Sequence, residues 1–151
     1  MAGLSPAKQL DVFLDRFTPE LAKLARAAIA RLRKRLRGAH LLVYDNFNAL
    51  VVGFGPTERA SHALFSLALY PRWINLFFLD GARLKDPKRR LKGAGSRVRH
   101  VRLSELALID DPDIDALINQ AIARADPPLD PKQKSRVIIR AIAPKQRPRR
   151  P

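Results

Sequence analysis

Residues 40–80 read HLLVYDNFNALVVGFGPTERASHALFSLALYPRWINLFFLD. Within this stretch the runs at 40–45, 49–54, 63–70 and 73–79 are rich in Val, Leu and aromatic residues, which favours β-strands. The connections between these runs are too short to hold a crossover helix. We therefore expect consecutive strands to pair antiparallel, as a meander.

Helices are predicted on both sides of this stretch. Apolar residues recur every three or four positions from 19 to 37, with Thr18 as N-cap and Gly38 as the stop. A shorter amphipathic segment at 7–17 precedes this helix. The same periodicity predicts a helix over 111–125, which should cover the same face of the sheet as the first long helix.

Two weaker strand patterns follow the meander, at 98–103 and 137–142, and the first reads as an edge strand. The end, 144–151, is rich in Pro and Arg and is predicted to be disordered. The sequence thus predicts an α+β domain over 1–143, followed by a basic disordered tail. Its antiparallel meander of about five strands should pack against N- and C-terminal helices.

Composition favours a soluble cytoplasmic protein. A chain of 151 residues with 46% hydrophobic and 28% charged residues is expected to form one globular domain. It contains no Cys, which suits a reducing compartment. Residues 1–10 lack the pattern of a signal peptide, and the longest apolar runs are strand-sized, so we expect no membrane association.

The net charge of +15 is concentrated in three segments. Residues 19–37 carry seven bases, residues 81–103 carry nine, and residues 132–151 carry eight and no acid. In the first segment five bases fall opposite the apolar stripe of the helix, and we expect them to contact nucleic acid if that is the partner. They are Lys23, Arg26, Arg33, Lys34 and Arg37.

Residues 76–103, LFFLDGARLKDPKRRLKGAGSRVRHVRL, carry three motifs. These are Phe77-Phe78 followed by Asp80-Gly81, the loop at 91–95, and Arg-His-Val-Arg at 99–102. With these motifs the chain resembles the YdhG-like family, small bacterial proteins of largely unknown function placed in a frataxin-like superfamily. The resemblance implies a compact sheet flanked by helices.

The same resemblance implies an alternative function, because some members are described as frataxin-like intracellular iron chaperones. Frataxins hold iron with acidic residues along their first helix, whereas the matching helix here carries Glu20 and seven bases. An iron site in this chain would use Asp45, Glu58, Asp80 or the acidic cluster at 110–115 instead. No other cofactor is expected.

The segment Lys-Gly-Ala-Gly-Ser at 92–96 is the best candidate for binding an anion. Glycines let successive N–H groups point at one phosphate, although the segment matches neither the P-loop nor the dinucleotide fingerprint, and a structural turn is the alternative. We predict a pocket at the end of the sheet. Its residues would be Tyr44, Trp73, Lys92, Gly93, Gly95, Arg97 and Arg99.

No catalytic motif accompanies these residues. Ser61-His62 and the segment 96–100 bring hydroxyl and imidazole together without a nucleophile elbow or an orienting acid. The sequence therefore favours a non-enzymatic binding module for a phosphorylated small molecule or nucleic acid. A protein-interaction module whose Arg-rich tail docks on an acidic partner is the remaining alternative.

Overall fold

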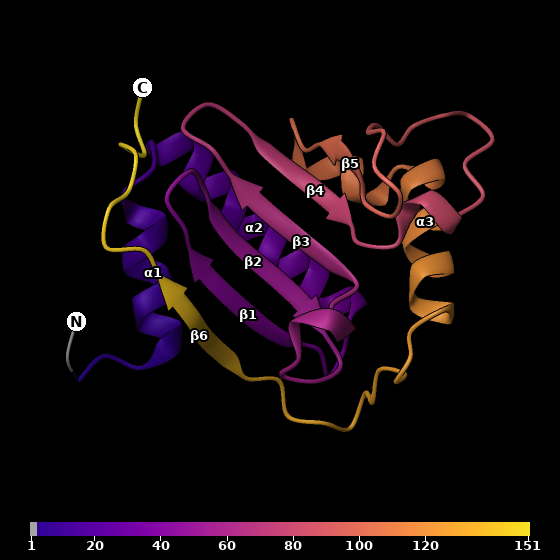
Figure 1. The fold of residues 1–151 in the computed structure, drawn as a ribbon, viewed down its shortest axis with the longest axis horizontal. Helices are drawn as coiled ribbons and strands as arrows, with labels where there is room; N and C mark the ends of the chain where they lie inside the picture. The colour runs from indigo at the N-terminus through magenta and orange to yellow at the C-terminus, as the bar shows by residue number, and fades with distance from the viewer. Residues whose placement is uncertain (1–2) are drawn as a thin grey trace.

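The computed structural model describes residues 3–151, which form three α-helices and a six-stranded sheet (Figure 1). The helices are α1 (Pro6–Asp15), α2 (Pro19–Arg35) and α3 (Pro112–Ala123). The strands are β1 (His40–Asp45), β2 (Leu50–Gly55), β3 (Phe65–Leu69), β4 (Ile74–Phe78), β5 (Arg99–Arg102) and β6 (Val137–Ile142). Three 3₁₀ turns connect them, η1 (Ala60–His62), η2 (Gly81–Arg83) and η3 (Leu106–Asp110).

Each helix begins with a capping side chain followed by proline at its first turn. Ser5, Thr18 and Asp111 accept hydrogen bonds from backbone N–H groups that have no partner inside the helix. Gly38 follows α2 with φ of +85°, which favours glycine. In residues 3–151 no helix is long and apolar enough to cross a bilayer.

The sheet has the order β5-β4-β3-β2-β1-β6. The first five strands form the antiparallel meander that the sequence predicts. The expectation of about five antiparallel strands is incomplete, because β6 adds a sixth strand that pairs parallel with β1. The chain between α3 and β6 runs around the sheet to its far edge (Figure 1), and such a long connection is what parallel pairing needs.

One face of the sheet forms the core. Its side chains alternate along each strand, as in Leu41 and Val43 or Leu76 and Phe78, and all belong to one buried cluster. Buried residues of α1, α2 and α3 join the same cluster, although α3 lies beside the sheet rather than across it (Figure 1). Figure 1 shows α2 behind the sheet and α1 next to its β6 edge.

The opposite face of the sheet, the open face, has no helix across it (Figure 1). By alternation and strand register it comprises Leu42, Tyr44, Val51, Gly53, Ser66, Ala68, Asn75, Phe77, His100 and Arg102. None of these residues is acidic, and Tyr44, Phe77 and His100 are half-buried. The open face is therefore an apolar and aromatic surface with positive charge at its β5 edge.

Residues 144–151, for which the sequence predicts disorder, pack against the domain in the structure. The Arg149 side chain is 4% exposed, and its Nη2 donates to Asp45 Oδ1 at 2.8 Å and to the Asn46 carbonyl at 2.6 Å. Arg150 donates to the backbone carbonyls of Asp15 and Arg16. Pro and Arg content indicates disorder only when no site on the domain receives those side chains, and here Asp45 provides one.

Candidate anion-binding site

Most acidic side chains are paired with arginine, and this pairing decides where positive charge is left over. The pairs are Asp11 and Asp15 with Arg26, Asp45 with Arg16 and Arg149, Glu58 with Arg136, Asp80 with Arg83, Arg97 and Arg124, Asp110 with Arg31, Asp111 and Asp113 with Arg90, and Asp115 with Arg35. The hydrogen bond from Arg90 holds the pKa of Asp111 below its usual range. An anion would bind where basic residues have no such partner.

The carboxylates that an iron site would use are the ones paired in this way. Asp45, Glu58, Asp80 and the acids at 110–115 each contact a guanidinium. Within residues 3–151 no three His, Cys, Asp or Glu side chains are placed to hold one metal ion. These residues do not fit an iron site, because a metal ion would have to replace an arginine at each carboxylate.

The outer face of α2 is less free than its sequence indicates. Arg26 donates to Asp11 and Asp15 at 2.8 and 2.7 Å, and these hydrogen bonds, that to Asp15 most, raise its pKa. Arg33 donates to the hydroxyl of Ser135. Lys23, Lys34 and Arg37 are exposed and form no ion pair with residues 3–151. This face presents separate lysines and arginines and no aromatic ring.

The glycine loop closes as a turn in the structure. The N–H and carbonyl of Lys92 bond to those of His100, at 2.7 and 2.9 Å. Arg99 Nη1 donates to the carbonyls of Gly95 and Val98. Gly93 has φ of +122°, which favours glycine for the turn itself. The polar contacts of the loop are therefore internal, as expected for the structural alternative.

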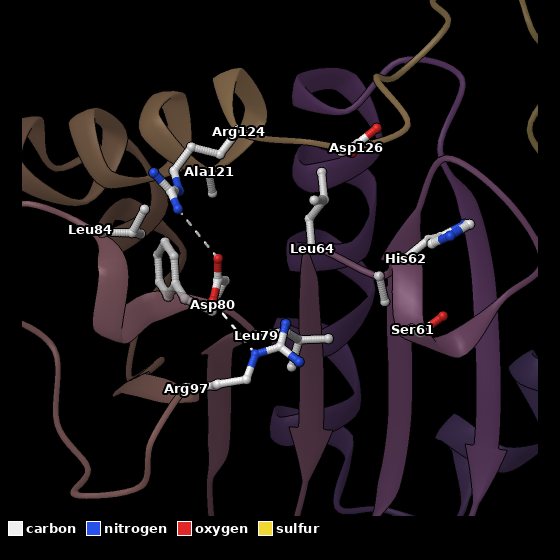
Figure 2. Close-up of a pocket in the computed structure, with 12 residues that line it drawn as sticks. Ser61, His62, Leu64, Leu79, Asp80, Leu84, Arg97, Ala121, Arg124 and Asp126 are labelled. Atoms are coloured by element: carbon white, nitrogen blue, oxygen red, sulfur yellow. Dashed lines mark ion pairs between the residues drawn. The ribbon is translucent and has the colours of Figure 1, made fainter.

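A pocket of about 190 Å³ lies between η1, the end of β4 and α3 (Figure 2). Arg97 and Arg124 reach Asp80 from opposite sides, with Nε and Nη2 at 3.6 and 3.7 Å from its carboxylate oxygens. Asp126 adds a second acid to the lining. Two arginines thus face two carboxylates, so this pocket carries no excess charge for an anion.

His62 lines the same pocket beside Ser61 (Figure 2). Its Nδ1 shares a 2.7 Å hydrogen bond with the hydroxyl of Thr57 rather than with Ser61. The adjacent serine and histidine are therefore not arranged as a nucleophile and its base.

A second pocket, of about 590 Å³, lies where the β3–β4 turn meets the C-terminal tail, and we call it the tail pocket. Tyr70 and Trp73 form one wall, stacked with ring centroids 5.1 Å apart and an interplanar angle of 25°. On the open face beside it, the Arg102 guanidinium lies 5.0 Å from the centre of the Trp73 ring. This wall therefore offers aromatic surface next to positive charge.

Three arginines complete the lining of the tail pocket, Arg72 from the turn and Arg147 and Arg150 from the tail. None forms an ion pair with residues 3–151, because the nearby acids Asp15 and Asp45 are paired with other arginines. Buried Arg149 lies between the two tail arginines in sequence and fixes the tail in place.

The structure separates the predicted site residues into four places. Trp73 lies in the tail pocket, Arg97 in the pocket beside α3, and Arg99 inside the glycine turn. Tyr44 and Lys92 belong to the open face and its edge, Tyr44 on β1 and Lys92 bridged to His100 of β5. Strand register thus keeps these residues on one sheet without bringing them into one pocket.

Sequence reasoning missed Tyr70, Arg72, Arg147 and Arg150. The segment Tyr-Pro-Arg-Trp at 70–73 carries a local signal, because two aromatics flank a two-residue turn and are held close by it. Arg147 and Arg150 of the tail have no such local signal in the sequence. Their position depends on the pairing of β6 with β1 and on Arg149 reaching Asp45, more than 100 residues away.

Comparisons of the chain with models of known protein families, with curated proteins and with solved structures find no significant match. The resemblance of residues 76–103 to YdhG-like proteins therefore rests on the sequence motifs alone. The side-chain chemistry of the tail pocket remains the strongest indication of function.

Proposed function

We propose that the protein is a non-enzymatic anion-binding module, which holds a phosphorylated ligand with a planar ring in the tail pocket. One observation carries the proposal. Arginines that have no acidic partner and a stacked pair of aromatic rings line the same pocket. The family resemblance neither requires nor opposes this function.

The chemistry of the lining matches both parts of such a ligand. Guanidinium groups donate paired hydrogen bonds to phosphate oxygens, and Arg72 and Arg147 supply two of them. Arg150 adds positive charge, although its Nε and Nη2 already donate to the carbonyls of Arg16 and Asp15. A planar ring can extend the stack that Tyr70 and Trp73 already form. The volume of about 590 Å³ falls within the range of small-molecule sites. A nucleotide has both parts.

The lining also supports binding without catalysis. Besides the arginines and the two aromatics, it consists of Asn48 and three prolines. General acid–base chemistry needs a group that exchanges protons near neutral pH, such as a histidine or a carboxylic acid, and arginine stays protonated. We therefore expect the ligand to be released unchanged.

Intrinsic fluorescence tests the proposal directly, because Trp73 is the one tryptophan of the chain. Titration with ATP should change its emission saturably, and the affinity should fall as salt rises. Ribose 5-phosphate has a phosphate but no planar ring, and adenosine has the ring but no phosphate. Each should therefore bind more weakly than ATP. No saturable change with ATP, by fluorescence or calorimetry, would refute the proposal.

Variants then locate the binding. Arg72→Ala and Arg147→Ala each remove one guanidinium and should weaken ATP binding about tenfold, since a hydrogen bond to a charged group contributes about 1.5–3 kcal/mol. Lys145→Ala is the matched control, because it removes an exposed base of the same tail that does not line the pocket. Equal losses in all three variants would indicate nonspecific charge attraction and contradict the assignment of the site.

A further inference from the structure

The tail pocket opens onto a row of side chains along β4 and β5. Asn75 and Phe77 lie on the open face of β4, and Trp73 directly precedes this strand in the same alternation. Register places Arg102 beside Asn75 and His100 beside Phe77, and Lys92 is bridged to His100 in turn. These six residues form what we call the β4–β5 track.

Aromatic rings occur at both ends of the track. At the pocket end Trp73 stacks with Tyr70, and the guanidinium of Arg102 lies 5.0 Å from the centre of the Trp73 ring. At the other end the rings of Phe77 and His100 have centroids 5.3 Å apart and are tilted by 48°. Trp73 and Phe77 are four positions apart, which is about 13 Å along a strand. Rings at this spacing provide two separate stacking places.

Charge on the track has one sign. Arg102 and Lys92 are exposed and form no ion pair with residues 3–151, and the track contains no acidic residue. Arg72, Arg147 and Arg150 continue the positive charge into the tail pocket. A polyanion that carries several flat rings would match both the charges and the rings.

We propose that single-stranded nucleic acid lies along the β4–β5 track, with one end in the tail pocket. Its bases would stack on Trp73 and Phe77, and its phosphates would contact Lys92, Arg102 and the pocket arginines. A duplex keeps its base faces stacked inside the helix, so it could reach only the charges. This inference rests on the proposed function, because the first nucleotide occupies the same pocket.

Fluorescence anisotropy with a labelled 12-nucleotide oligothymidine tests the inference, beside unlabelled dTMP and a 12-base-pair duplex. The oligonucleotide should bind at least tenfold more tightly than dTMP and more tightly than the duplex. Phe77→Ala should weaken oligonucleotide binding about tenfold, as expected for one lost stacking contact, and leave dTMP binding unchanged. Phe77→Leu removes the ring but keeps the apolar packing, so it should show the same loss of oligonucleotide affinity. It replaces Phe77→Ala as the test variant if the alanine variant does not fold.

Two further variants distinguish the track from the helix face. Lys92→Ala removes a charge at the far end of the track, and Lys34→Ala removes an exposed, equally unpaired charge on the outer face of α2. Only the first should lower oligonucleotide affinity. An equal or larger loss with Lys34→Ala, or an oligonucleotide that binds no better than dTMP, would overturn the inference while the pocket assignment stands. If neither dTMP nor ATP binds, the proposed function fails as well.

Discussion

Replacing Arg149 with alanine tests whether the C-terminal tail is docked on the domain in solution. Its guanidinium is almost fully buried against Asp45, whose side chain is 1% exposed. Besides this ion pair it donates to the carbonyls of Asn46 and Phe47. Arg149→Ala therefore leaves the buried Asp45 carboxylate and the Asn46 carbonyl without their closest donor, whereas the Phe47 carbonyl still accepts from the Arg147 N–H at 2.9 Å.

The expected loss of stability follows from these contacts. Removing one partner of a buried ion pair costs about 3–5 kcal/mol. Arg16 also contacts Asp45, at 3.2 Å, but it is 43% exposed and compensates only partly. We therefore expect the free energy of unfolding to fall by about 3 kcal/mol, the lower end of that range. With a urea m-value of about 2 kcal/mol/M, the midpoint should drop by about 1.5 M.

Urea unfolding followed by circular dichroism measures this loss. Arg149→Lys keeps the charge but not the planar fork, so its stability should lie between those of Arg149→Ala and the native protein. Lys145→Ala, at an exposed position without an ion pair, should change stability by no more than about 0.5 kcal/mol. If Arg149→Ala also stays within that margin, the tail is not docked and the reasoning is refuted.

Two further predictions concern the folded domain. Gly38→Ala should lower the free energy of unfolding by about 2 kcal/mol or more, because φ is +85° and a Cβ would collide with the carbonyl of Asp130; native-like stability in urea would contradict this. Burial lowers the pKa of His40, so the unfolded chain binds the proton more readily. Stability should be fully present above about pH 6.5 and decline as pH falls below it. Urea midpoints at pH 8 and pH 5 measure this loss of stability. The loss should be smaller in His40→Asn, and an equal loss in that variant would contradict the role of His40.

Much of the fold follows from local sequence patterns. Runs rich in Val, Leu and aromatic residues within 40–80 predict β1 to β4 to within two residues at each end, and the 3.6-residue period predicts a helix over 19–37, of which α2 forms 19–35. Capping residues such as Thr18 mark the helix starts. These patterns suffice because turns and helix ends depend on neighbours a few positions away, and short connections allow only antiparallel pairing.

The candidate site could be predicted only in part. The sequence singles out Trp73 and Lys92 as ligand-binding residues, and the proposed track contains both. It also groups Arg97 with them, although Asp80 pairs with that arginine in a separate pocket. Contacts between distant segments decide which basic side chains are left without an acidic partner. Composition cannot give those contacts.

The sequence by itself determined the α+β class, the excess of positive charge and the five-stranded meander, all of which depend on composition or on short-range periodicity. Only the tertiary structure decided that β6 pairs parallel with β1 and that Arg149 reaches Asp45. Those two contacts bring Arg147 and Arg150 beside Trp73. The physical reason is distance along the chain, because no local propensity encodes which segments meet after more than ninety intervening residues.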